Sequence, residues 1–472
     1  MTKAAPPVFS LFWVFSRARA ALLAAGLLSM GPLSTGRVWA AESAPRAAEA
    51  PAAFDVRVEN AEGAGRRETR LVFTLNACVE HRVYVLDQPA RAVADLPEVK
   101  FLIDPSHGAP KQSRRRAKSS SLSDRPLSYR FGRLSPGRSR IIVDLPGPFE
   151  VSASCAQKNG MSELILAIKP TDPAAFRAAA RAGAEAQTRE TLKQETLQQT
   201  GAESTAATAP PAAVSDQQPL IVLDPGHGGV DAGTIGPDNV IEKDVVLDFA
   251  KALAGALRAG GHYRVAFTRE DDTFVPLQAR VRIAQKLGAA LFVSLHADSL
   301  PGAQAGAHPD IRGATVYTAS DRASDAEAAR VAESENQADA LAGQEAQEQA
   351  GEVNDILFDL TRRETRAFSN IFAQYLSERW KIAATLNKNP RRHAGFVVLK
   401  APDVPSVLLE LGYLSSAQDA AELTSPQWRE KAAAQAAQAI DDFFASRRAA
   451  PVPAALAPAA LAPAALTEPR SP

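Results

Sequence analysis

The pattern of apolar and polar residues divides the chain into two folded regions of different type. Between residues 54 and 170, segments such as "TRLVFTLNA" and "SRIIVDLPG" alternate apolar with polar residues and are separated by Gly, Pro and Asp. This alternation is typical of half-buried antiparallel strands. We therefore expect an all-β, sandwich-like domain over 54–170.

The second region, 219–447, alternates strand-like with helix-like segments. "LIVLD", "ALFVSLHAD" and "VPSVLLELGYLS" have the apolar runs of buried strands, whereas "EKDVVLDFAKALAGALRAGG" and "AFSNIFAQYLSERW" carry apolar residues at helical spacing. The alternation predicts an α/β domain with a mainly parallel sheet flanked by helices. In such sheets, ligands bind at the carboxyl ends of the strands.

The first 40 residues have the pattern of a secretory signal peptide. Arg17 and Arg19 precede the short apolar run "AALLAAGLL", and "RVWA" at 37–40 places small residues at a cleavage site. A membrane anchor would need about 20 apolar residues, and Gly and Pro interrupt this run sooner. We expect export and no membrane span once the signal is cleaved.

The remaining segments have the composition of linkers. Residues 41–53 are predicted to be flexible, and 171–218 to form a helical spacer, which starts at Asp172, followed by a Pro/Ala linker. Residues 448–472 repeat "PAALAPAAL" and are predicted to be a disordered Ala/Pro tail. Within the β region, the basic "KQSRRRAKSSSLSDR" is interpreted as a solvated loop.

Composition narrows the possible chemistry. The 53 Lys and Arg balance the 53 Asp and Glu, so no overall field favours nucleic acid as a partner. Cys78 and Cys155 lack the spacing of a thiolate metal site, which leaves histidines and carboxylates as metal ligands. Both cysteines fall in the exported β region, where oxidising conditions permit a disulfide, although the sequence leaves their geometry open.

The glycine-rich stretch "IVLDPGHGGVDAG" follows a predicted strand and contains a histidine. It does not match a phosphate-binding loop, because Asp231 stands where a dinucleotide fingerprint has its third glycine and no Gly-Lys-Ser/Thr follows. His227 lies just past the strand "IVLD", and His296 ends the strand "LFVSL". The two histidines are therefore expected at the same edge of the sheet.

Two acidic residues are expected at the same edge. Glu242 lies in the first turn of the helix after the glycine-rich loop, and Glu410 ends the apolar strand "SVLLE". A first-turn glutamate often serves only the helix dipole, but an unpaired buried carboxylate at a strand end costs several kcal/mol. Two imidazoles and one carboxylate make a three-ligand zinc set with an open fourth position, as in catalytic sites.

These motifs carry a family resemblance. "LDPGHGGVDAG", "EKDVVLDFAKAL", "FVSLHADS" and "PSVLLELGYLS" resemble, in order, the signatures of the zinc-dependent N-acetylmuramoyl-L-alanine amidases of bacterial cell division. The resemblance implies that His227, Glu242 and His296 bind Zn²⁺, that Glu410 is the catalytic acid/base, and that the substrate is the amide between N-acetylmuramic acid and L-alanine in peptidoglycan. "VYVLDQPARAVADLP" and "SRIIVDLPGPFE" resemble the AMIN module of the same family.

An acidic insert at 321–366 interrupts the α/β pattern. Ser324 and Glu327 form a capping box that predicts a helix start, and the helix that follows could simply be solvated. The family resemblance implies instead an inhibitory helix that places a glutamate on the zinc, with Glu335 or Glu333 as the candidate, and a protein activator of the division machinery that releases it.

Two other functions remain compatible with the residues. One is a cell-wall binding scaffold that holds zinc without turnover, which the presence of Glu410 beside three ligands argues against. The other is a zinc carboxypeptidase that cuts stem peptides. The products separate these possibilities, because only an amidase releases an intact stem peptide from the sugar.

Overall fold

The computed structural model describes residues 50–63, 66–108, 127–206, 218–297, 312–344 and 356–449. The predicted signal peptide, the basic serine-rich loop, most of the Pro/Ala linker and the Ala/Pro tail lie outside the described residues. The predicted flexible segment 41–53 is described only at its end, where the first strand already begins at Ala52.

The N-terminal region is a two-sheet β domain. The first sheet has the order β5 (Lys100–Phe101), β1 (Ala52–Gly63), β2 (Arg66–Leu75), β9 (Met161–Pro170), β8 (Phe149–Lys158). The second has the order β3 (Arg82–Leu86), β4 (Arg91–Pro97), β7 (Arg138–Asp144), β6 (Tyr129–Ser135), and the short helix η1 (Pro105–Gly108) follows β5. Leu71 and Phe73 of the first sheet share one core with Ile141 and Val143 of the second. The predicted sandwich-like architecture is confirmed.

A disulfide joins Cys78, just after β2, to Cys155 in β8. The two Cα atoms are 5.8 Å apart, which is within the usual range for the bond. The pairing that the sequence left open is therefore present.

Helix α1 (Pro173–Ala206) follows the β domain. Asp172 caps it as predicted, because its carboxylate accepts hydrogen bonds from the amides of Ala174 and Ala175 at 2.7 and 3.0 Å. This helix also packs on the β domain, since Phe176 and Ala180 are buried in its core. Apolar residues one turn apart are enough to bind the first turns of this helix to the sheet.

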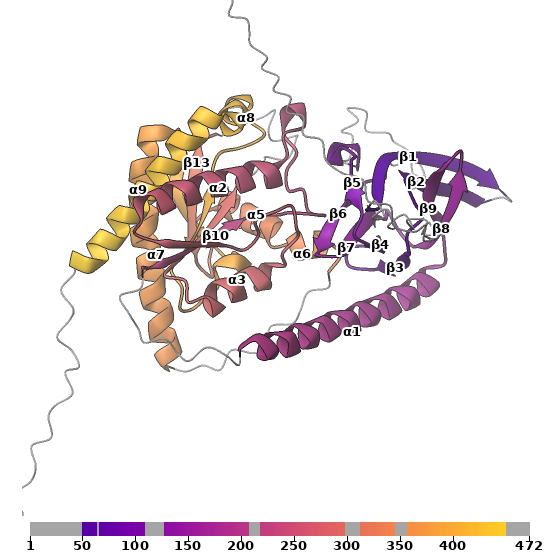
Figure 1. The fold of residues 1–472 in the computed structure, drawn as a ribbon, viewed down its shortest axis with the longest axis horizontal. Helices are drawn as coiled ribbons and strands as arrows, with labels where there is room; N and C mark the ends of the chain where they lie inside the picture. Colours follow the sequence, from indigo (N-terminus) through magenta and orange to yellow (C-terminus); the bar gives the residue numbers. More distant parts are fainter. Residues whose placement is uncertain are drawn as a thin grey trace, which may run out of the picture. The chain divides into compact units, whose positions relative to one another are not determined.

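The α/β domain is built on one mixed sheet (Figure 1). Its order is β11 (Arg264–Phe267), β10 (Leu220–Pro225), β12 (Leu291–His296), β15 (Ser406–Glu410), β13 (Ala314–Ala319), β14 (Leu386–Ala394). Every neighbouring pair is parallel except β13 and β15, which are antiparallel. The prediction of a mainly parallel sheet is confirmed.

Helices cover both faces of this sheet. Ile221 and Leu223 pack with α2 (Glu242–Gly260), α7 (Ile356–Ala383) and α9 (Pro426–Ala449). The alternate residues Leu220 and Val222 pack on the other face with α3 (Leu277–Lys286), α5 (Ala326–Glu335) and η4 (Val397–Leu399). The smaller helices are η3 (Pro237–Asn239), α6 (Ala338–Leu341) and α8 (Ala417–Thr424). Burial on both faces explains why the strands read as continuous apolar runs.

None of the helices in the described part of the chain is long and apolar enough to cross a bilayer.

The disulfide generates the first prediction. Reduction should lower the free energy of unfolding of the β domain by roughly 4 kcal/mol in the chain-entropy model, because the bond closes a loop with a sequence separation of 77. Hydrogen exchange of peptides from β2 and β9 should accelerate after reduction of the full chain, with peptides from α9 as the control. Two titratable thiols in the denatured, unreduced protein would contradict the bond.

Candidate metal centre

Three neighbouring strands bring the predicted site residues to one edge of the sheet. His296 is the last residue of β12 and Glu410 the last of β15, and the two are paired in register across the parallel ladder. His227 follows the end of β10, the neighbour of β12 on its other side. Glu410 is fully buried. The strand-end placement expected from the sequence is therefore what the topology produces.

The loop after β10 has an unusual backbone that buried arginines hold in place. His227 has φ of 58°, a left-handed conformation that is uncommon for a residue with a side chain. Arg280 donates a hydrogen bond to the carbonyl of His227 at 2.8 Å, and Arg269 donates one to that of Gly226 at 2.7 Å. Arg280 also pairs with the buried Asp224 at 2.9 Å. Burial alone would raise the pKa of Asp224, but Arg280 holds it below its usual value.

Two glycines of the loop make room for the imidazole rings. A Cβ at Gly226 would lie 2.4 Å from Cε1 of His296. A Cβ at Gly233, whose φ is +66°, would lie 2.7 Å from Cδ2 of His227 and 2.8 Å from Oε2 of Glu242. Such separations are far below van der Waals contact. The glycines that resemble a phosphate cradle in the sequence therefore serve close packing around two histidines.

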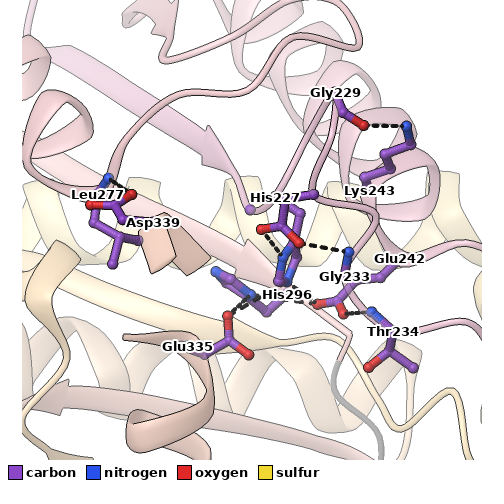
Figure 2. A network of polar contacts seen from close by, with 12 residues as sticks. His227, Gly229, Gly233, Thr234, Glu242, Lys243, Leu277, His296, Glu335 and Asp339 are labelled. Carbon is purple, nitrogen blue, oxygen red and sulfur yellow. Dashed lines mark hydrogen bonds and ion pairs between the residues drawn. The ribbon is translucent and has the colours of Figure 1, made fainter. Parts of the chain in front are cut away.

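The imidazole nitrogens converge on a carboxylate (Figure 2). Nε2 of His227 lies 3.1 Å from Oε1 of Glu242, and Nδ1 of His296 lies 3.5 Å from the same oxygen. Both nitrogens are buried, and neither makes a hydrogen bond of acceptable geometry with any residue that the structure describes. Imidazole nitrogens and a carboxylate that converge without hydrogen bonds of good geometry are the arrangement expected around a cation.

Further contacts orient these groups. Nδ1 of His227 is 2.9 Å from Oδ2 of Asp231, which fixes the ring and leaves Nε2 directed at the site. Glu242 accepts hydrogen bonds from the amides of Thr234 at 2.9 Å and Ala297 at 2.8 Å. This role of Asp231 was not predicted from the sequence, although its position four residues after His227 within the same turn is a usable signal.

Glu335 also reaches the histidines. Its Oε2 lies 3.0 Å from Nδ1 of His296 and 3.5 Å from Nε2 of His227 (Figure 2). His227, His296 and Glu335 form a group whose candidate ligand atoms all lie within 4.8 Å of one another. Glu335 is 7% exposed, whereas Glu333 is exposed to solvent. Of the two glutamates considered from the sequence, the structure brings Glu335 to the site and leaves Glu333 outside it.

The charges at this site shift the pKa values of both histidines. Burial disfavours a charged imidazole, but Glu242, Asp231 and Glu335 together raise the pKa of His227 well above its usual value. Burial also disfavours the charged imidazole of His296, but Glu335 and Glu242 outweigh this effect and raise the pKa of His296 to about 10. Without a metal, the carboxylates thus hold protons on the imidazoles. A divalent cation bound here would replace these protons, because metal ligands must be deprotonated.

Helix α5, which carries Glu335, begins one residue later than predicted. Its N-cap is Asp325, whose carboxylate accepts a hydrogen bond from the amide of Ala328 at 2.9 Å. The prediction of a capping box with Ser324 is therefore wrong. Glu327 instead accepts a hydrogen bond from the hydroxyl of Tyr413 at 3.0 Å, because a tertiary partner is available to it.

The segment is anchored to the α/β domain on both sides of Glu335. Ala328 and Val331 of α5 are fully buried in the core. After Glu335, the side chain of Asn336 bonds the carbonyl of Gly395 at 2.9 Å and the amide of Val397 at 2.8 Å. The glutamate therefore lies in the middle of a well-packed segment.

Comparison with known proteins gives one consistent family. A family model described as N-acetylmuramoyl-L-alanine amidase matches residues 221–442. The N-acetylmuramoyl-L-alanine amidase AmiA of Escherichia coli (strain K12) is 38% identical over 242 residues, which are 51% of this chain and 81% of that protein.

A second relative matches a longer part of the chain. The amidase AmiC of Escherichia coli O6:H1 (strain CFT073) is 30% identical over 384 residues, which are 80% of this chain and 87% of that protein. This match is longer than the α/β domain and so extends into the β domain. Among solved structures, the amidase AmiC2 of Nostoc punctiforme is 26% identical and covers 49% of this chain and 99% of that chain, with a TM-score of 0.35.

The close approach of Gly226 to His296 generates a prediction about metal content. Gly226→Ala should displace the imidazole of His296, because the new methyl group would overlap the ring, and purified protein should then hold much less than stoichiometric zinc. The control is Gly255→Ala on the exposed face of α2, where an added Cβ meets nothing within 4 Å and zinc should stay bound. Elemental analysis measures both. Stoichiometric zinc in folded Gly226→Ala protein would show that the packing around His296 is not needed.

Proposed function

The chain belongs to the N-acetylmuramoyl-L-alanine amidase family, and from this premise we propose that it is an exported, zinc-dependent peptidoglycan hydrolase that its own Glu335 holds inactive. The substrate is the amide between N-acetylmuramic acid and the L-alanine of the stem peptide. The observation that carries the proposal is the convergence of two imidazole nitrogens and two carboxylates at one buried point.

The proposed zinc ligands are His227, Glu242 and His296. Nitrogen and oxygen donors of this kind suit Zn²⁺, and three protein ligands leave one position for chemistry. A bound zinc ion supplies a Lewis acid that polarises the amide carbonyl and lowers the pKa of a water molecule. Asp231 keeps His227 in the orientation that directs Nε2 at the metal.

Glu410 is proposed to move the protons. It ends β15 in register with His296, so its carboxylate belongs to the same edge of the sheet as the ligands. Full burial gives the carboxylate a dry environment, in which a base is more effective than in water. In this role Glu410 accepts a proton from the attacking water and delivers it to the nitrogen of the leaving L-alanine.

The structure is proposed to represent a closed state, in which Glu335 blocks the site. The carboxylate of Glu335 lies within 3.5 Å of both imidazole nitrogens, where it takes the position that substrate and water need. The attraction between a carboxylate and a divalent cation in a buried site favours this state. A protein activator of the division machinery that binds the open state better would shift the equilibrium towards activity.

The β domain is proposed to be an AMIN domain that targets the enzyme to peptidoglycan at the division site. None of its residues that the structure describes belongs to the group of candidate metal ligands, and the match to AmiC extends into it. The signal peptide expected at residues 1–40 would deliver the protein to the periplasm, where its role would be the separation of daughter cells.

Product analysis with a Glu410 variant tests the reaction. Digestion of peptidoglycan should release intact stem peptides with a free amino group on L-alanine, and Glu410→Gln should lower the rate by about 10²- to 10⁴-fold while zinc stays bound, because only the proton acceptor is lost. Loss of a terminal amino acid would instead indicate a carboxypeptidase. No product from an activated enzyme would indicate a scaffold, and a Glu410→Gln variant at the parental rate would remove Glu410 from the mechanism.

The closed state is tested by two neighbouring glutamates. Glu335→Ala should raise the activity of the resting enzyme on dye-labelled sacculi by about tenfold or more, the change that a loss of about 1.4 kcal/mol in the closed state produces. Glu333→Ala is the matched control, because Glu333 is exposed and two positions away on the same helix. A wild type already as active as Glu335→Ala would show that the site is open at rest.

A further inference from the structure

The segment that carries Glu335 ends in a contact with the β domain. Residues 325–344, called here the latch segment, comprise α5, α6 and the turn Ala342–Gln344. Arg140 of β7 donates hydrogen bonds to the carbonyls of Ala342 at 3.1 Å and Gly343 at 3.0 Å. The guanidinium is thus bound to the carbonyls that directly follow α6, within the one compact unit that spans Ala50–Pro472.

Arg140 is held in place by residues of its own domain. Its Nε and Nη2 donate to the two carboxylate oxygens of Asp95 at 2.6 and 3.1 Å, and Nη2 also lies 3.0 Å from the hydroxyl of Tyr84. Only 2% of Arg140 is exposed. A planar guanidinium fixed on one side by a bidentate carboxylate presents its remaining donors in a set direction. The latch segment lies in that direction and accepts hydrogen bonds from these donors.

Further contacts fit the turn closely. Nε2 of Gln187, on α1, donates to the carbonyl of Gly343 at 2.5 Å. Gly343 has φ of +69°, and a Cβ there would lie 3.2 Å from Cγ2 of Val93 and 3.4 Å from Cδ1 of Ile142. The backbone of the turn therefore lies directly on the four-stranded sheet.

An apolar cluster continues this contact. Ala342 is fully buried together with Leu134 and Ile142 of the β domain and Val230 and Phe274 of the α/β domain. Val230 lies in the loop that carries His227. Residues of both domains thus enclose the end of the latch segment.

We propose that the β domain is the second half of the latch: Arg140 and Gln187 form a carbonyl niche that binds the end of the latch segment and keeps Glu335 on the histidines. This inference rests on the proposed closure of the site by Glu335. The carbonyls of Ala342 and Gly343 are buried and need hydrogen-bond donors, and the arginine of the niche supplies charge-assisted hydrogen bonds to both. The occupant of the niche is this chain's own segment.

The position of the niche explains how it acts on Glu335. Ala342 follows Glu335 by seven residues, and between them Asn336 and Asp339 bond to the α/β domain. The segment is therefore tied at both ends, by α5 to the α/β domain and by the turn to the β domain. A ligand that draws the β domain away from the segment would remove the second tie, which couples binding by the β domain to opening of the site.

The test uses the full-length, zinc-loaded protein. Arg140→Ala should raise resting activity on dye-labelled sacculi by about tenfold, because hydrogen bonds from a charged group to two buried carbonyls are lost. Hydrogen exchange of residues 326–344 should accelerate as well, a readout that does not depend on turnover. Arg130→Ala is the control, because Arg130 lies in the same sheet and pairs with Asp144, and neither readout should change.

A second variant keeps the test decisive if Arg140→Ala unfolds the β domain. Gln187→Ala removes one donor of the niche from a partly buried position on α1, so it should fold and give a smaller change in the same direction in both readouts. Folded Arg140→Ala and Gln187→Ala proteins that both match the wild type in activity and exchange would overturn the niche.

Glu335→Ala, measured in parallel, separates the two proposals. If it activates the enzyme while the niche variants change nothing, closure by Glu335 stands and the niche is wrong. If it does not activate, closure by Glu335 is wrong, and the exchange of residues 326–344 in Arg140→Ala still decides whether the niche holds the segment.

Discussion

Two buried imidazole nitrogens and two buried carboxylates meet at the carboxyl edge of the central sheet. These groups can be buried together only if positive charge compensates the carboxylates. The imidazole nitrogens of His227 and His296 lie only 3.0–3.5 Å from carboxylate oxygens of Glu242 and Glu335. Carboxylates taken out of water at such a site must be compensated, by protons on the imidazoles or by a cation. The same carboxylates raise the pKa values of both histidines. A zinc ion would compensate the carboxylates through ligands of the type that it prefers.

The rest of the α/β domain serves to hold these groups in place. Parallel pairing of neighbouring strands places His296 beside Glu410. The absence of a side chain at Gly226 lets the loop that carries His227 approach the ring of His296. Arg269 and Arg280 hold the carbonyls of that loop and so maintain a backbone conformation that His227 would otherwise avoid. Strand ends, glycines and buried arginines therefore act as one support for the ligands.

Much of this arrangement could be predicted from the sequence, because parallel strands bring their carboxyl ends to one edge. That rule alone placed His227, His296 and Glu410 together. The choice between Glu333 and Glu335 could not be made, since residues two apart on a helix point about 200° apart and only tertiary packing decides which faces the two histidines. The same holds for Arg140, because a hydrogen bond from a side chain to a distant carbonyl leaves no pattern in the sequence.

The most direct test of the central claim is a crystal structure of the zinc-loaded protein with anomalous data collected at the zinc edge. The account predicts one strong anomalous peak within about 2.0–2.2 Å of ligand atoms from His227, Glu242 and His296, with the carboxylate of Glu335 as the fourth ligand. A peak located elsewhere, or a zinc ion at this point with Glu335 turned away into solvent, would contradict it.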